Sequence, residues 1–174
     1  MRHANKAATN WVQGSTTARC KRLYGDHLVY RDGTTVDPDQ PRAGAATLTA
    51  SARGRQAVAS HVCSYTAVQV AAAIGVTRGL GYRIPIPALL AGTAINAATH
   101  AALDRGALLL AVADRIGKRG YIDHCQATRV DDEGNVTTEI NGPGTAWIAL
   151  DDAAHRAIGV AAAALTTWLA IRQR

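Results

Sequence analysis

The chain has 174 residues, of which 16 are glycine and none is phenylalanine, and it carries a formal net charge of +6 at pH 7. That length fits one domain with its own core, and the residue types exclude a core of phenylalanine rings, so helices must pack through small residues. The three cysteines (Cys20, Cys63 and Cys125) form no paired motif, which excludes a disulfide framework or thiolate zinc knot and fits a reducing, cytoplasmic setting.

The positive charge is concentrated at the start of the chain. Residues 1–55 contain nine Lys or Arg and four acidic residues, whereas residues 107–141 contain four and six. A basic end of this kind fits nucleic acid or an anionic lipid surface. Because no DNA-reading motif and no interleaving of basic and aromatic residues accompanies it, a lipid bilayer is favoured as the partner and nucleic acid is disfavoured.

The first segments are polar. Residues 2–22 are expected to form a helix that ends in a basic run, Arg19-Cys20-Lys21-Arg22. Residues 27–37 then predict a β-hairpin, because two short β-prone stretches flank an Asp32-Gly33 turn.

Two uncharged runs follow. Helices are expected over 56–77 and 84–104, and neither run contains Asp, Glu, Lys or Arg before Asp104. A bilayer-spanning helix needs about 20 apolar residues, so each run is long enough to cross. A short Gly-rich turn from Arg78 to Arg83 separates them.

The rest of the chain predicts a short helix, a hairpin and a long helix, over 107–117, 127–140 and 145–171. The expected fold is therefore mainly α: one domain over 1–174, built as a small antiparallel membrane bundle of three to four helices with two short β-hairpin inserts. A soluble Ala-rich bundle is the alternative, and the mean hydropathy of −0.04 would fit it.

Basic residues around the two runs predict their orientation. Arg53 and Arg55 precede the first run, whereas Arg105, Arg115 and further basic residues follow the second. By the positive-inside rule, the start of the first run and the end of the second face the cytoplasm. The chain is therefore expected to be a multi-pass inner-membrane protein whose hairpins and basic segments are cytoplasmic.

Polar residues recur at helical spacing in separate segments. His100 and Asp104 are four residues apart, so they share one helix face, and Asp151 and His155 repeat the spacing in reverse order. His61 with Tyr65 and, in the first helix, Gln13 complete the set. With alternating helix directions, all these residues fall at one depth, near the cytoplasmic face.

The same residues resemble a family of small bacterial and phage integral membrane proteins, domain of unknown function 3307. The matching segments are Asn10-Trp11-Val12-Gln13, His61-Val62-Cys63-Ser64-Tyr65, His100 to Asp104, and Leu150-Asp151-Asp152-Ala153-Ala154-His155. The chain departs from the family pattern at three positions. It has Asn5 and Thr9 where the family has His and Asp, and Asp152 where the family has Gln. The resemblance implies a bacterial or phage origin, a membrane location and a helical bundle, but no activity.

One hypothesis for the shared site is a divalent metal. Neutral imidazoles with carboxylates suit Zn²⁺, Mn²⁺ or Fe²⁺, and pairs four residues apart are a common way to present them in a bundle. The candidate ligands are His61, His100, Asp104, Asp151 and His155, with Gln13, Tyr65 and Asp152 as supporting residues. A metal with an open coordination position could activate water for hydrolysis.

Other interpretations use the same residues. The His and Asp side chains can pair with one another as a polar network that fixes helix packing, or relay protons or a small solute. A binding module is a further alternative, in which the hairpins contact a cytoplasmic protein partner. The sequence does not indicate an oligomeric state.

Overall fold

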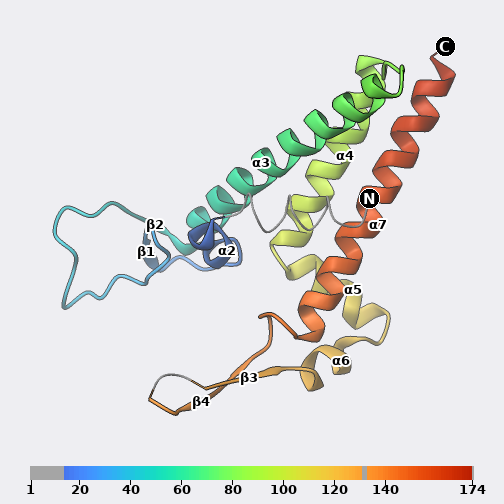
Figure 1. Cartoon of the computed structure of the whole chain (residues 1–174). Coiled ribbons are helices and arrows are strands. Elements are labelled where there is room, and N and C mark those ends of the chain that lie inside the picture. Colours follow the sequence, from blue (N-terminus) through green and yellow to red (C-terminus); the bar gives the residue numbers. More distant parts are fainter. Residues whose placement is uncertain (1–13, 131–132, 174) are drawn as a thin grey trace.

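The computed structural model describes residues 14–130 and 133–173, and it is mainly helical (Figure 1). The expected mainly α class is confirmed, and two small antiparallel sheets are present, but three short helices accompany the three long ones in the described part of the chain. The helices in the described part of the chain are α2 (Ser15–Cys20), α3 (Ala50–Gly79), α4 (Ile86–Asp104), α5 (Ala107–Arg115), α6 (Arg119–His124) and α7 (Ala146–Arg172).

Helix α4 lies between α3 and α7 and runs antiparallel to both (Figure 1). Side-chain caps fix where the two flanking helices start: Thr49 accepts a hydrogen bond from the Ala52 amide, and Thr145 accepts one from Ile148. Because Thr49 caps α3, this helix begins at Ala50 rather than at 56, and the basic residues expected just outside it lie within its first turns. Helix α6 was not expected from the sequence.

A glycine allows the closest approach between long helices. A Cβ atom at Gly92 of α4 would collide with Thr166 Oγ1 of α7 and lie 3.1 Å from the Ala162 carbonyl oxygen. The α4–α7 contact therefore depends on a residue without a side chain, as is typical of closely packed membrane helices.

The first sheet differs from the expected hairpin over 27–37. Strand β1 (Leu28–Tyr30) pairs with β2 (Thr47–Thr49), and only a single bridge, Val29 to Thr35, joins β1 to the segment expected as its partner. Two prolines, Pro38 and Pro41, follow that segment, and their missing amides cannot continue a strand ladder. The expected hairpin over 27–37 therefore forms in part. The Tyr30 amide donates to the Thr34 carbonyl and the Val36 amide to the Leu28 carbonyl, whereas the longer ladder of β1 is with β2.

The second sheet falls within the expected 127–140. Strand β3 (Ala127–Val130) pairs with β4 (Val136–Glu139) in antiparallel register, with Val130 opposite Val136. Both sheets and the short helices lie at the same end of the long helices (Figure 1).

The long helices expose apolar surface. Helices α3, α4 and α7 are each long and apolar enough to cross a membrane, and only 6% of the most apolar stretch of α7 is buried within the chain. The largest buried apolar cluster instead lies at the end of α4 near the short helices, where Leu103, Leu109, Ile122 and Trp147 pack together. The exposed faces of the long helices therefore resemble a lipid-facing surface.

Candidate metal centre

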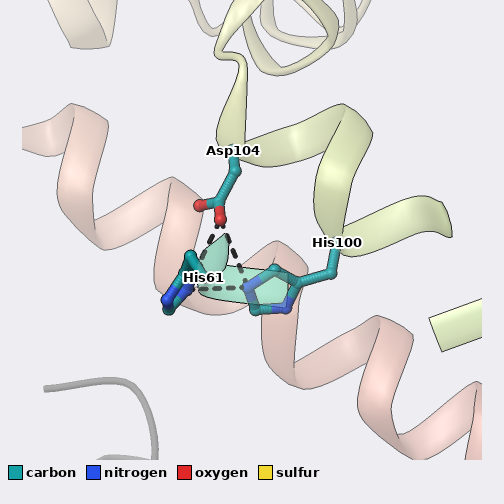
Figure 2. Close-up of side chains that lie close together, drawn as sticks. All are labelled: His61, His100 and Asp104. Atoms are coloured by element: carbon teal, nitrogen blue, oxygen red, sulfur yellow. Dashed lines mark hydrogen bonds and ion pairs between the residues drawn. The ribbon is translucent and has the colours of Figure 1, made fainter. Parts of the chain in front are cut away.

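Helices α3 and α4 bring His61, His100 and Asp104 together (Figure 2). His100 and Asp104 lie one turn apart on the face of α4 that packs on α3, and His61 comes from the facing side of α3. The three side chains are at most 2% exposed. The sequence spacing therefore leads to one enclosed group of two imidazoles and a carboxylate.

The three facing atoms form a nearly equilateral triangle. His61 Nε2 lies 3.2 Å from His100 Nε2, and each nitrogen lies 3.4 Å from Asp104 Oδ2. A tetrahedral zinc ion with bonds of about 2.0–2.1 Å would hold its ligand atoms about 3.3 Å apart. The triangle thus has the dimensions of one face of a metal coordination polyhedron.

The two oxygens of Asp104 have different partners. Oδ1 accepts a hydrogen bond of 2.7 Å from the Lys21 ammonium, whose side chain is 11% exposed. Oδ2 faces the imidazoles and has no hydrogen-bond partner among the described residues, and the same holds for His61 Nδ1. Because buried polar atoms normally have partners, the unpartnered Oδ2 that faces the imidazoles indicates that the triangle accommodates a further group.

His155 of α7 adjoins the triangle. Its ring stacks edge-on against His100, with centroids 4.2 Å apart, and its Nε2 lies 3.8 Å from Asp104 Oδ1. Its Nδ1–H donates to the Asp151 carbonyl at 2.8 Å, which in the neutral ring leaves the Nε2 lone pair toward Asp104. His155 is therefore oriented as a neighbouring nitrogen ligand or acceptor.

Asp151 lies beyond His155, farther from the triangle. Its carboxylate is 3.7 Å from His155 Nδ1 and 3.4 Å from the Arg22 guanidinium, which also lies over the Trp147 ring. The structure thus places Asp151 beside His155 rather than at the triangle.

One expected supporting residue lies away from the site, and another falls outside the described residues. Asp152 is exposed and forms an ion pair of 3.0 Å with Arg156, away from the triangle. Gln13 lies outside the described residues.

Tyr65 packs against the site and links it to a second polar group. Its ring centroid is 4.2 Å from that of His100, and its hydroxyl accepts a hydrogen bond of 2.6 Å from Gln69. Gln69 in turn accepts from Asn96, which also hydrogen-bonds Tyr65. This Tyr65–Gln69–Asn96 network joins α3 to α4 one turn beyond the imidazoles.

Sequence reasoning missed three residues of this region: Lys21, Gln69 and Asn96. Gln69 follows Tyr65 by four residues and Asn96 precedes His100 by four, so the helical spacing would have found both. Lys21 gave no such signal, because a basic run at the end of a helix is equally typical of a solvated surface.

Comparisons add no relative to this geometry, since no family model, curated protein or solved structure matches the chain. The class of protein is therefore defined by the fold and the site alone: a helical bundle with three helices able to span a membrane and a buried His–His–Asp group that could hold a metal ion. The resemblance to domain of unknown function 3307 stays a prediction.

Proposed function

We propose that this protein is a multi-pass inner-membrane protein that binds one divalent transition-metal ion through His61, His100 and Asp104. The observation that carries the proposal is the buried triangle of two imidazole nitrogens and one carboxylate oxygen, with edges of 3.2–3.4 Å. Nitrogen and oxygen donors of this kind fit Zn²⁺, Mn²⁺ or Fe²⁺.

The membrane location is supported by the exposed apolar faces. Large apolar side chains such as Leu90, Val160 and Ile171 are 62–71% exposed on the long helices, which would be unfavourable in water. The ends of α3 and α4 that carry the metal site also carry Arg53, Arg55 and Arg105, so the positive-inside rule favours a site near the cytoplasmic face.

A metal ion explains the contacts better than mutual pairing does. An Nε2–H to Nε2 hydrogen bond between His61 and His100 satisfies those two atoms, but it leaves Asp104 Oδ2 without a partner in the described part of the chain. An ion inside the triangle would satisfy Asp104 Oδ2 and both Nε2 atoms at once. Binding is favoured over hydrolysis, because activation of water for a substrate needs an open coordination position and these side chains are enclosed.

The second candidate function is a polar network without a ligand. It is favoured by the Lys21 ammonium, which already provides a cation for Asp104 at 2.7 Å. In that case the site would only fix helix register and hold α2 on α4.

Metal analysis separates the two candidates. Protein purified in detergent is stripped with chelator, loaded with Zn²⁺, Mn²⁺ or Fe²⁺, and desalted before the metal per chain is measured. We expect about one ion per wild-type chain and none in His100→Ala. The metal content of His124→Ala should equal that of the wild type, because His124 is exposed. Wild-type protein without metal after loading would contradict the metal site and leave the polar network.

A further inference from the structure

A hollow lies beside the first turns of α3, apart from the metal site. It has a volume of about 390 Å³ and is bordered by the β1–β2 sheet on one side and by α3 on the other. Val29 and Leu48 face each other in the sheet register and form its apolar side. Arg53, Gln56 and Ser60 are spaced by three and four residues, so they share one face of α3 and form its polar side.

The charge of the hollow is positive. Arg31 and Arg53 both line it, and none of the described residues around it is acidic. Arg53 is held in place by hydrogen bonds to the Arg31 carbonyl oxygen at 2.8 Å and to Gln56 at 3.2 Å. Within the described part of the chain neither guanidinium has a carboxylate partner, whereas Arg42 nearby is paired with Asp32. Two arginines in this arrangement favour an anion.

The position of the hollow along α3 indicates what kind of anion. Past Ser60, the same helix face continues with exposed Cys63, Ala67 and Ala71, in a stretch without charged residues. The hollow therefore lies where α3 changes from charged to apolar. In a bilayer-spanning α3 this is the level of the lipid headgroups.

We propose that the hollow binds the headgroup of an anionic phospholipid, an inference that rests on the membrane location proposed above. The phosphate lies between Arg31 and Arg53, the ester region contacts Gln56 and Ser60, and an acyl chain follows the exposed face of α3. Apolar Val29 and Leu48 cover the other side of the headgroup. The cytoplasmic leaflet is the side that carries anionic lipids, in agreement with the expected orientation.

Native mass spectrometry of delipidated, detergent-solubilised protein tests this site. The probes are phosphatidylglycerol and phosphatidylcholine with the same acyl chains, and inorganic phosphate as competitor. We expect one retained phosphatidylglycerol, bound at least about tenfold more tightly than phosphatidylcholine and not displaced by phosphate. The double variant Arg31→Gln/Arg53→Gln should weaken phosphatidylglycerol binding about thirtyfold, because each basic residue near an anionic lipid surface raises the affinity about fivefold.

Matched variants separate a defined site from general charge. Arg55→Gln/Arg78→Gln removes the same charge from exposed positions on α3 outside the hollow and should leave binding unchanged. Ser60→Trp keeps both arginines but fills the hollow, so it should also weaken phosphatidylglycerol. Equal binding of both lipids, equal effects of the two double variants, or displacement by phosphate would overturn the proposal, the last result indicating a small-anion site.

The outcome is independent of the metal site. Each variant is checked for helical content, so loss of lipid with the fold retained concerns the hollow alone, whether or not the chain binds a metal ion. Failure of the membrane location itself would be evident separately, if carbonate extraction released the wild-type protein from membranes.

Discussion

At the scale of single residues, Asp104 is the group on which the site depends. Its Oδ1 accepts from Lys21, and its Oδ2 faces His61 and His100, so one carboxylate joins α2 to the α3–α4 pair. Without a metal ion, Lys21 is the nearest cation to this buried negative charge. Lys21 and a divalent ion should therefore compete electrostatically for Asp104.

Lys21→Met tests this competition. Removing the ammonium leaves the Asp104 carboxylate buried without a cation, so we expect the metal-free protein to lose about 3–5 kcal/mol of unfolding free energy. For the same reason zinc should bind at least about tenfold more tightly, as measured by competition with a chelating dye. Arg42→Met breaks an ion pair whose side chains are 51% and 42% exposed, so it should leave the free energy of unfolding nearly unchanged. Unchanged zinc affinity in Lys21→Met would contradict the competition.

The exposed Asp32–Arg42 pair predicts a pH dependence outside the long helices. The hydrogen bond from Arg42, followed by that from the Thr34 amide, holds the pKa of Asp32 well below its ordinary value of 3.8. A lowered carboxyl pKa stabilises the fold above the unfolded value and loses that effect as the pH falls toward the folded value. Arg42→Gln should therefore raise the pKa of Asp32, observed by NMR titration of its carboxyl carbon. An unchanged midpoint would show that Arg42 is not the cause.

The sequence predicted part of the site at this scale and missed the rest for a physical reason. His61, His100 and Asp104 meet because helical spacing and antiparallel packing suffice to place them. Lys21 reaches Asp104 from a short helix whose position depends on loop geometry, which no periodic pattern records. Asp152 was included because it falls at a position of the family pattern, but it adjoins Asp151, and adjacent residues on a helix face different directions.

At the scale of elements, α4 determines the arrangement, because it packs on both α3 and α7. Its contact with α7 depends on Gly92, which lies against Thr166 and the Ala162 carbonyl oxygen. Its contact with α3 contains the Tyr65–Gln69–Asn96 network and the metal site. Moving α4 relative to α7 should therefore move His155 relative to Asp104.

Gly92→Ala tests that contact. The added methyl group would collide with Thr166 and push the helices apart, so we expect a loss of about 1–3 kcal/mol in unfolding free energy. Gly75→Ala is the matched control, because nothing lies within 4 Å of the added Cβ atom and alanine favours a helix by up to about 1 kcal/mol. Equal effects of the two substitutions in a denaturant titration would contradict close α4–α7 packing.

The long helices were predictable from their uncharged runs, whereas the first sheet was not. A strand pair such as β1–β2, whose connection contains two prolines, has no sequence signal as strong as an Asp-Gly turn. The Asp32-Gly33 turn does form, with Gly33 at a φ of 87°. The segment after this turn forms only the bridge from Thr35 to Val29, because Pro38 and Pro41 follow and cannot continue the strand ladder.

At the scale of the whole molecule, the three cysteines report on insertion and sidedness. Cys20 is buried, Cys63 is exposed on the uncharged part of α3, and Cys125 is exposed just after α6, beside the β3–β4 sheet. If the long helices cross a bilayer, Cys20 lies in a protein core, Cys63 faces lipid, and Cys125 faces water, on the cytoplasmic side if the proposed orientation holds.

Maleimide labelling in inner-membrane vesicles distinguishes these environments. We expect a membrane-impermeant maleimide to label Cys125 in inside-out vesicles and not in right-side-out vesicles, and to leave Cys63 unlabelled in both. A lipid-soluble maleimide should label Cys63, and single Cys→Ser variants identify each labelled position. Labelling of Cys63 by the impermeant reagent would argue for a soluble bundle, and the opposite sidedness of Cys125 would reverse the proposed orientation.

The central claim is that two imidazoles and one carboxylate bind a single metal ion, and zinc-edge X-ray absorption measures this coordination directly. The wild-type spectrum should contain light-atom ligands at about 2.0–2.1 Å, with outer-shell scattering from at least two imidazoles. His61→Ala should lose one imidazole, whereas His27→Ala, whose exposed histidine lies outside the site, should leave the spectrum unchanged. A spectrum without imidazole scattering, or one that His61→Ala leaves intact, would contradict the metal site.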